Sequence, residues 1–365
     1  MGLQVGIVGL PNSGKTTLFN LLTGGHAEVA GHPFSTVSPN RGVVAVPDRR
    51  LEILARLLHP PQVVPATIEF VDVAGLVEGA SKGEGLGNQF LSHIRAVDAV
   101  VEVLRFFQDR SIPHVAGDIN PLRDRDIVDT ELLLADLEVV ERRLEKLREL
   151  LRKTKDERLR EEKEILEQCF VALSQGIPVR AVDFPPGAWE ILKPYQLITA
   201  KPLLYVANLD EEESSRRLFE EVRKRFEEEG LPLLPVWTKL ETELSEFEEE
   251  EQKAFFAAFG IPGPGFIRLV EEAYRLLGLI TFYTYGEKEL RARELPRGTR
   301  APQAAGKVHT DMERGFIKAE VIHFEDLVAC GSFERARQEG RIRLEGREYE
   351  IQDGDIVYFR FTSPR

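Results

Sequence analysis

The eight residues at positions 9–16, GLPNSGKT, limit how this chain can fold more than any other segment. They match the pattern G-x-x-x-x-G-K-[ST]. A short β-branched apolar run at 3–9 leads into them, and residues 15–22 carry leucines at helical spacing. A strand, a glycine-rich loop and a helix in this order form the context in which the pattern binds phosphate. The segment therefore predicts an α/β domain with a phosphate-binding loop after its first strand.

Each part of this loop suits a different part of a nucleotide. The glycines let successive N–H groups point inward at the phosphates, and the start of the helix adds its positive end. Lys15 is expected to reach the β- and γ-phosphates, and the Thr16 hydroxyl to ligate Mg²⁺. The expected nucleotide contacts in the loop are Gly9, Asn12, Ser13, Gly14, Lys15, Thr16 and Thr17.

Three segments further along the chain fit a nucleotide switch. Asp72 ends an apolar run and is expected near the metal, directly or through water, with the Gly75 N–H near the γ-phosphate. Thr36 is expected to close over Mg²⁺ when the third phosphate is present. Residues 79–87 contain four glycines and are expected to order and disorder with the nucleotide. The candidate metal ligands are Thr16, Thr36 and Asp72, and Lys15 and Gly75 are candidate catalytic groups.

The remaining apolar runs predict the rest of the α/β domain. They alternate with helical stretches, which is typical of a mostly parallel sheet covered on both faces. These runs lie at 67–73, 99–104, 202–207 and 233–236.

Two other segments break this alternation. Leucines repeat at steps of three and four over 133–151 and again over 159–173, which favours a helical hairpin, or coiled coil, inserted at 126–174. One long helix and two ordinary surface helices are the alternatives. Short strand-like pieces separated by turn signals predict a β-rich domain at 281–365. The nucleotide-binding domain would then comprise 1–125 and 175–280.

Composition narrows the function classes. The chain has 48 Lys and Arg against 61 Asp and Glu, a net charge of −13, so contact with a polyanion has to be local. Residues 288–307, with six basic and two acidic side chains, are one such local excess, or an ordinary solvated loop. Cys169 and Cys330 lie far apart without metal-ligand spacing, which favours buried free thiols in a reducing compartment. With no apolar run long enough for a bilayer, we expect a cytoplasmic protein without membrane contact.

Together these motifs resemble a known family. The loop with Pro11-Asn12, the run from Asp72 to Leu76 and the glycine-rich stretch after it are similar to the Obg-related translation-factor GTPases. The hairpin and the β-rich tail, which is similar to a TGS domain, narrow the resemblance to the YchF subfamily of Obg-like ATPases. The resemblance covers essentially the whole chain. It implies a cytoplasmic nucleotide hydrolase that associates with ribosomes, for which the TGS-like domain and the hairpin are the expected contacts; RNA is a candidate partner.

The base-reading motif departs from that of a GTPase. A guanine-specific P-loop protein carries N-K-x-D, and this chain has Asn208, Leu209, Asp210 and Glu211 in that frame. Losing the Lys and the paired carboxylate removes strong discrimination for guanine. Leu209 could offer an apolar face to adenine, so Asn208, Leu209 and Glu211 are assigned to an ATP site. Asp210, one position early, keeps GTP as the runner-up.

The group that positions the attacking water is also unusual. Leu76 stands where a Ras-like enzyme has glutamine, and a hydrophobe cannot orient water. His114, after the strand at 99–104, is one candidate, with an ordinary packed histidine as the alternative. Asn12 is the other, because the resemblance associates an asparagine here with a K⁺ ion. A nucleotide-stabilised ribosome-binding module with little turnover competes with the enzyme, and a small-molecule kinase fits least well.

Overall fold

The computed structural model describes residues 3–25, 39–73 and 86–362. Thr36, Gly75, Leu76 and most of the glycine-rich stretch at 79–87 lie outside these ranges. The chain forms two compact units. The first contains Leu3–Gly42 and Glu69–Leu269, and the second contains Val43–Ile68 and Val270–Arg365.

The first unit is built on a six-stranded sheet in the order β2-β4-β1-β5-β6-β7. β1 pairs in parallel with β4 and β5, and β6 pairs in parallel with β5 and β7, which confirms the expected mostly parallel sheet. The strands are β1 (Gln4–Val8), β2 (Asn40–Ala45), β4 (Thr67–Asp72), β5 (Ala99–Arg105), β6 (Leu203–Asn208) and β7 (Leu233–Val236).

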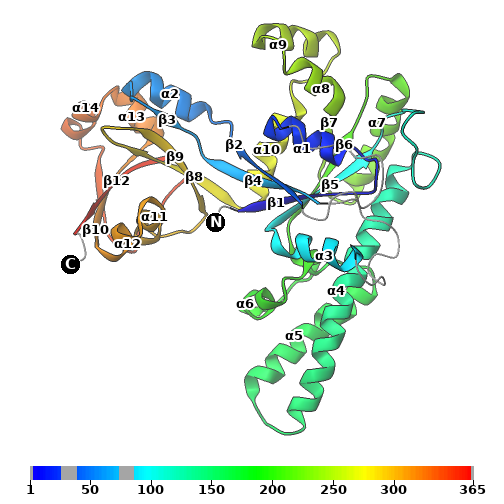
Figure 1. Ribbon diagram of the computed structural model, residues 1–365. Coiled ribbons are helices and arrows are strands. Elements are labelled where there is room, and N and C mark those ends of the chain that lie inside the picture. Colours follow the sequence, from blue (N-terminus) through cyan, green and yellow to red (C-terminus); the bar gives the residue numbers. More distant parts are fainter. Residues whose placement is uncertain (1–2, 26–38, 74–85, 363–365) are drawn as a thin grey trace. The chain divides into compact units, whose positions relative to one another are not determined.

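Helices cover both faces of this sheet, as its apolar strands require. Every residue of β1, β5 and β6 is buried, so these strands can exist only between two layers of helices. Figure 1 shows α1 and α8 on one side and α3 and α4 on the other. The helices besides the hairpin are α1 (Lys15–Thr23), α3 (Leu86–Ala96), α6 (Ala188–Leu192), α7 (Glu213–Glu228), α8 (Thr238–Leu244) and α9 (Glu249–Ala258). A further helix, α10 (Gly265–Leu276), begins in the first unit and belongs to the second from Val270 onward.

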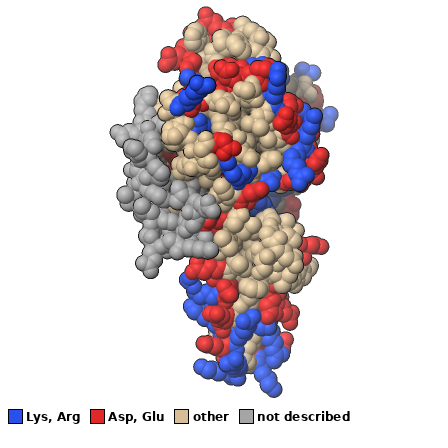
Figure 2. All heavy atoms as spheres, turned by 90° about the vertical axis from the view of Figure 1, so that its right-hand side faces the viewer, with Lys and Arg blue, Asp and Glu red and all other residues tan. Residues whose placement is uncertain are grey.

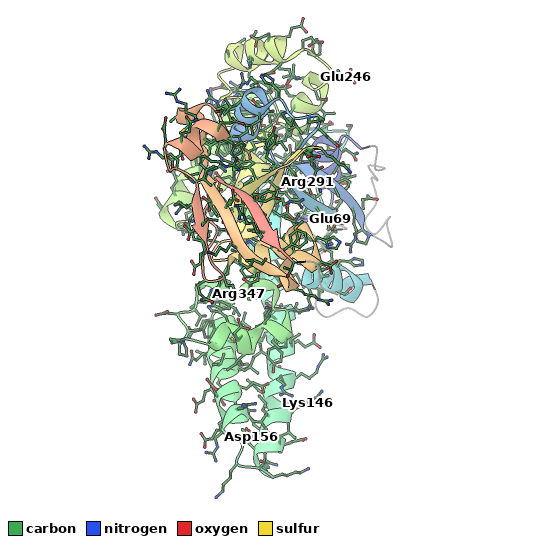
Figure 3. All side chains as sticks on the ribbon, turned by 90° about the vertical axis from the view of Figure 1, so that its left-hand side faces the viewer. Glu69, Lys146, Asp156, Glu246, Arg291 and Arg347 are labelled. Carbon is green, nitrogen blue, oxygen red and sulfur yellow. The ribbon has the colours of Figure 1, made fainter. Side chains whose placement is uncertain are left out.

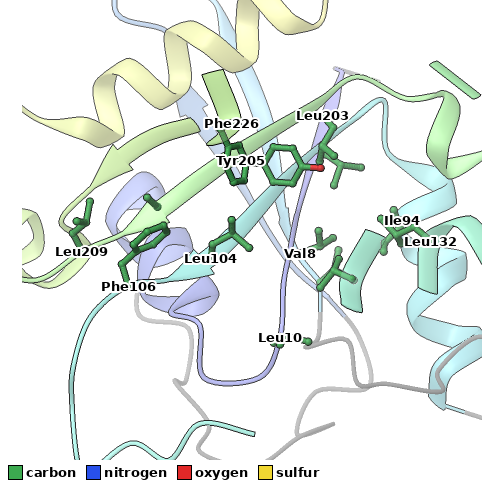
Figure 4. Packing of buried hydrophobic residues seen from close by; sticks show 14 of the residues in the cluster. Val8, Leu10, Ile94, Leu104, Phe106, Leu132, Leu203, Tyr205, Leu209 and Phe226 are labelled. Atoms are coloured by element: carbon green, nitrogen blue, oxygen red, sulfur yellow. The ribbon is translucent and has the colours of Figure 1, made fainter. Parts of the chain in front are cut away.

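Aromatic and aliphatic side chains fill the core of the first unit (Figure 4). Tyr205 and Phe226 meet edge to face with ring centroids 5.1 Å apart, and Val8, Leu104 and Leu132 belong to the same cluster. Because the carboxyl ends of the strands emerge from this packed layer, the loops that follow them start from fixed positions.

The helical hairpin is present, and the single long helix is excluded. α4 (Pro121–Leu151) ends one turn before Asp156, whose carboxylate caps α5 (Glu157–Ser174) by accepting from the Arg158 N–H. The hairpin thus begins at Pro121, a few residues earlier than expected. The leucine repeats form its seam, where both helices contribute buried side chains: Val140, Leu144, Leu147, Ile165, Leu166, Cys169 and Leu173.

Asp136 fixes the base of the hairpin to the rest of the first unit. Its carboxylate is fully buried and lies 2.8 Å from the Arg95 guanidinium. It also accepts from the Ile198 and Thr199 N–H groups and from the Thr199 hydroxyl. A buried carboxylate with this many donors is strongly destabilising to remove, because its partners would stay buried without compensation.

The second unit has a mixed sheet in the order β11-β10-β12-β8-β9-β3. Neighbours are antiparallel except for the parallel pairs β12–β8 and β3–β9, and α11 packs against one face in a second apolar core. The strands are β3 (Val63–Val64), β8 (Leu279–Tyr285), β9 (Leu290–Pro296), β10 (Phe316–His323), β11 (Arg343–Glu345) and β12 (Asp355–Phe361). The helices are α2 (Arg49–Leu58), α11 (Ala301–Val308), α12 (Thr310–Arg314), α13 (Phe324–Cys330) and α14 (Phe333–Gln338).

The second unit contains a segment that the sequence analysis assigned to the nucleotide-binding domain. Residues 43–68 were expected in the nucleotide-binding domain, but they pack with the C-terminal residues. Asp48 caps α2 and accepts a 2.6 Å hydrogen bond from the Tyr283 hydroxyl. Arg50 donates two hydrogen bonds to Asp353, at 2.9 and 3.1 Å. These long-range polar contacts carry no local sequence signal, which is why the boundary differs.

Two further expectations concern the cysteines and the absence of a membrane span. Cys169 and Cys330 are buried free thiols, as expected. Within the described ranges, no helix combines the length and apolar character that a membrane span requires.

Replacing Asp136 with Ala should lower the free energy of unfolding by about 3–5 kcal/mol, because it removes the counter-charge of Arg95 and leaves two buried N–H groups without their acceptor. Urea denaturation measures this loss, and hydrogen exchange should show faster exchange at the Ile198 and Thr199 amides. Glu141, exposed on the same helix, provides the control: Glu141→Ala should change stability by less than about 0.5 kcal/mol. Equal losses in the two variants would contradict this role of Asp136.

Candidate functional site

The loop at 9–14 is held in a shape that few sequences can adopt. Gly9, Asn12 and Gly14 all have positive φ, at 145°, 64° and 95°. A Cβ on Gly9 would lie 2.5 Å from the Val103 carbonyl oxygen, and one on Gly14 would lie 2.1 Å from Asn208 Nδ2. Asparagine tolerates the left-handed region better than most side chains, which suits Asn12. Both glycines are therefore required by close packing as well as by backbone conformation.

Lys15 begins α1 and keeps its amine inside the loop. The side chain is almost fully buried, and Nζ donates a 2.7 Å hydrogen bond to the Leu10 carbonyl. Burial lowers the pKa of Lys15 to about 8, against the opposing effect of the nearby Asp72 carboxylate. A cation in this position is poorly solvated, so an incoming phosphate would supply the negative charge that it lacks.

Thr16 and Asp72 meet beside this amine. Asp72 is the last residue of β4, in register with Ile7 of β1, so the sheet itself carries its carboxylate to the loop. Thr16 Oγ1 donates to Asp72 Oδ2 at 2.9 Å. Burial raises the pKa of Asp72, and the bond from Thr16 and the charge of Lys15 oppose that rise.

This pair suits Mg²⁺, which prefers hard oxygen ligands and commonly takes one or two from protein while phosphate and water supply the rest. A hydroxyl and a carboxylate that already touch provide two such oxygens. The carboxylate is also short of solvation, which a divalent cation would compensate.

Asn208, at the end of β6, connects the sheet to the phosphate loop through its side chain. Its Nδ2 donates to the Ser13 carbonyl at 3.0 Å, and its Oδ1 accepts from the Thr238 hydroxyl at 2.7 Å. All of these groups are buried. Thr238 was missed by sequence reasoning, and the available signal was its position two residues after β7 ends at Val236.

The residues after Asn208 lie differently from the expectation. Leu209 is 2% exposed and packs in the apolar core, so its side chain presents no open face to a base (Figure 4). The Asp210 carboxylate accepts from the N–H groups of Gln108 and Glu212, at 2.7 and 3.1 Å. Glu211 is exposed. Of the expected base-reading residues, the structure thus brings only Asn208 to the loop.

His114 lies in a loop that touches the phosphate loop directly. Asn12 Nδ2 donates to the Pro113 carbonyl at 3.0 Å, which connects the two loops. The His114 ring is 4% exposed, its Nε2 lies 2.8 Å from Asp124 Oδ2, and its Nδ1 accepts from the Ala116 N–H. These partners assign the proton to Nε2. Asp124, in the first turn of α4, is a second residue that sequence reasoning missed.

The structure therefore gathers Lys15, Thr16, Asp72 and Asn208 around one loop, with the His114 loop beside it. Thr36 and Gly75 lie outside the described residues. A parallel α/β sheet with this glycine-rich loop, a lysine inside it and a Thr–Asp pair next to it defines a P-loop nucleoside triphosphatase domain.

Comparisons with known proteins identify the family. Residues 4–159 match the family model MMR_HSR1, described as "50S ribosome-binding GTPase", and residues 279–362 match YchF-GTPase_C, described as "Protein of unknown function (DUF933)". The chain is 46% identical over 366 residues to "Ribosome-binding ATPase YchF" of Bacillus subtilis (strain 168), covering 99% of this chain and 100% of the relative. The corresponding protein of Escherichia coli O157:H7 is 42% identical over 363 residues, with the same coverage.

A solved structure agrees with these relatives. It is described as "Structure of the Schizosaccharomyces pombe YchF GTPase", is 37% identical, and superimposes with a TM-score of 0.86 over 98% of each chain. The chain belongs to the YchF family. The expected fold class is thereby confirmed: an α/β P-loop domain, an inserted helical hairpin and a C-terminal TGS-like domain.

Triphosphate affinity should fall as pH rises above about 8. Below that pH the Lys15 amine is charged before and after binding, whereas above it the free site has lost a proton that the bound phosphates draw back. Calorimetry in buffers of different ionisation enthalpy should record uptake of up to one proton at pH 9, together with weaker binding. In Lys15→Ala, binding should be weaker at every pH and take up no proton. An absence of proton uptake by the wild-type chain at pH 9 would refute this.

Proposed function

We propose that this chain is a Mg²⁺-dependent ATPase whose nucleotide state controls its association with ribosomes in the cytoplasm. The observation that carries the enzymatic part is the buried Lys15 amine beside the Thr16–Asp72 pair. The names of the bacterial relatives, ribosome-binding ATPases, support the assignment. The solved fungal relative is called a GTPase, so a GTPase of translation is the alternative.

The residues of the loop divide the work of phosphoryl transfer. Backbone N–H groups of residues 12–17 bind the phosphates, and Lys15 neutralises charge on the transferring group. Thr16 and Asp72 hold Mg²⁺, with Thr36 as a further proposed ligand and the Gly75 N–H as a proposed contact to the γ-phosphate. When bound, Mg²⁺ supplies the positive charge that offsets the phosphate oxygens.

The proposed preference for ATP rests on two residues of the guanine-reading motif that this chain lacks. Leu209 replaces the lysine and is buried, and Glu211 replaces the aspartate and is exposed. Asp210, the runner-up for reading guanine, already accepts two backbone N–H groups. Without a free carboxylate aimed at the base, the strong discrimination of a guanine-specific site is lost.

The wild-type chain should bind ATP more tightly than GTP in a titration at matched Mg²⁺. Asp210→Asn should alter the two affinities equally, as should the exposed control Glu211→Gln. Lys15→Ala should abolish hydrolysis of either nucleotide, which ties turnover to this loop. If GTP binds the wild type at least tenfold more tightly, about 1.4 kcal/mol, the preference is wrong, and a GTP-specific loss in Asp210→Asn would make Asp210 the guanine reader.

Water positioning is assigned to His114, with a K⁺ ion at Asn12 as the competing proposal. The Asn12–Pro113 hydrogen bond keeps the histidine loop against the phosphate loop, and Asp124 fixes the imidazole proton on Nε2. To act on a water molecule, the imidazole has to leave at least one of its present partners. The K⁺ proposal uses the other atom of the same amide, Asn12 Oδ1, an oxygen of the kind that binds alkali cations.

His114→Ala should lower the turnover number at least tenfold with nearly unchanged ATP affinity, because the contact is made chiefly in the transition state. His114→Gln and a thermal unfolding measurement control for loss of the buried Asp124 contact. Replacing K⁺ with Na⁺ tests the competing proposal, and it leaves the Asn12–Pro113 contact that holds the histidine loop in place. Wild-type turnover in His114→Ala, combined with collapse of turnover in Na⁺, would assign the task to the cation.

The ribosome contact is proposed to involve the TGS-like domain and the hairpin, with RNA as one partner. The description of the matched N-terminal model, a 50S ribosome-binding GTPase, supports association with a ribosomal subunit. The remaining alternative is a binding module that the nucleotide merely stabilises; a ribosome affinity that differs between the ADP and ATP-analogue states would exclude it.

A further inference from the structure

Arg105 is a buried cation at the end of β5, with an exposed fraction of only 3%. Figure 2 shows the usual place of Lys and Arg in this protein, at the surface and next to Asp and Glu. Within the described ranges, Arg105 forms no ion pair. Burial lowers the pKa of Arg105, and the more distant Asp109 and Asp124 carboxylates oppose this change. A buried cation without a salt bridge is unfavourable for folding, so its other contacts need an explanation.

The Arg105 guanidinium donates three hydrogen bonds, and all of them go to one loop. Nε donates to the Phe107 carbonyl at 3.3 Å, and Nη2 donates to the carbonyls of Asp109 and Ile112 at 3.2 and 2.9 Å. The guanidinium also lies over the Phe107 ring, with Cζ 4.3 Å from the ring centroid. One side chain therefore fixes most of the segment that leads from β5 to His114.

Other contacts hold the two ends of this segment. The Phe107 N–H donates to the Asn208 carbonyl at 3.2 Å, and Asn12 Nδ2 donates to the Pro113 carbonyl at 3.0 Å. Because Arg105 also holds Ile112, the backbone is fixed up to the residue before His114. An imidazole that leaves one of its present partners would then move from a defined backbone position.

An ordinary stabilising arginine is the alternative explanation. Arg347, labelled in Figure 3, shows what such a residue looks like, because it donates to the Phe316 carbonyl and lies over the Phe316 ring while it stays exposed to water. In Arg105, by contrast, Nη1 is buried and has no hydrogen-bond partner among the described residues. An unpaired buried donor on a charged group costs free energy, so Arg105 contributes little net stability and its loop contacts indicate another role.

We propose that Arg105 is a positioning residue for ATP hydrolysis, which fixes the loop at 107–113 so that the His114 imidazole reaches the attacking water from a defined position. The inference rests on the role proposed above for His114. Holding the loop in place before the reaction reduces the entropy lost in the transition state, so the effect falls on turnover. ATP affinity depends on Arg105 much less, because Asn208 holds the start of the loop independently.

The first variant is Arg105→Lys in the full-length chain. Lysine keeps the positive charge but replaces the planar fork by one nitrogen, which cannot serve three carbonyls along the loop. The turnover number should fall at least tenfold, while the dissociation constant for ATP stays within about twofold. Hydrogen exchange should become faster at the amides of residues 108–114 and stay unchanged in the rest of the sheet.

Arg347→Lys is the matched control, because it removes the same two kinds of contact from an exposed arginine. Its turnover number and its ATP affinity should both stay within about twofold of wild type. Thermal unfolding of both variants shows whether the remainder of the chain is intact.

The double variant Arg105→Lys with His114→Ala tests whether Arg105 acts through the histidine. If it does, adding Arg105→Lys to His114→Ala should lower the turnover number by less than about twofold, because the group that Arg105 positions is already absent. Two independent contributions would instead multiply, and the double variant would lose the full tenfold again.

A second variant loosens the same loop from its exposed side, in case Arg105→Lys does not fold. Ser111 donates its N–H and its hydroxyl to the Asp109 carboxylate, at 2.8 and 2.5 Å. Ser111→Gly removes the hydroxyl contact and adds backbone freedom without changing the core, so turnover should fall about threefold at unchanged ATP affinity. In the His114→Ala background it should have no effect. Unchanged turnover of the single Ser111→Gly variant would contradict the need for a fixed loop.

Wild-type turnover in Arg105→Lys, with reduced turnover in His114→Ala, would overturn the inference and leave the proposed role of His114 intact. A full further loss in the double variant would also overturn it, because Arg105 would then act without His114. Parallel losses of turnover, ATP affinity and thermal stability would identify a general structural role. Wild-type turnover in His114→Ala would refute the proposed role of the histidine, and the inference about Arg105 would fail with it.

Discussion

The hydrogen bond from Asn208 to the Ser13 carbonyl is the contact on which the site depends. It connects the end of β6 to the phosphate loop after β1. The Asn208 amide that makes this bond also fills the space that a side chain at position 14 would need. The end of β6 thus holds the loop in place. This preorganisation means that the nucleotide does not have to order the loop when it binds, so more of the binding energy remains for affinity.

Burial within this fixed loop also leaves two charged side chains of the site poorly solvated. Lys15 lies inside the loop with a lowered pKa, and Asp72 lies next to it with a raised one, both because of burial. Each is solvated less well than it would be in water, and each is suited to one part of a magnesium–triphosphate complex. The site therefore trades some stability of the empty protein for affinity toward phosphate and metal, a trade common at functional sites.

Sequence reasoning succeeded where local pattern and chemistry coincide. The strand–loop–helix around Lys15, the strand end at Asp72 and the heptads of the hairpin all lie where their patterns predict. It was less informative where the structure depends on contacts between residues that are far apart in the sequence. The Asp48–Tyr283 and Arg50–Asp353 contacts assign 43–68 to the second unit, and the burial of Leu209 follows from core packing. The Asp124 partner of His114 likewise depends on how α4 meets a loop, which no spacing in the sequence encodes.

Co-sedimentation of the full-length chain with ribosomes, in Mg²⁺ with ADP, with a non-hydrolysable ATP analogue and without nucleotide, tests most directly whether the phosphate loop controls docking. Ribosome affinity should differ at least fivefold between the ADP and ATP-analogue states, about 1 kcal/mol, because the two nucleotides differ at the γ-phosphate beside Lys15. Lys15→Ala should abolish that difference. Identical affinity in all three states of the wild-type chain would contradict a nucleotide switch and leave a ribosome-binding scaffold.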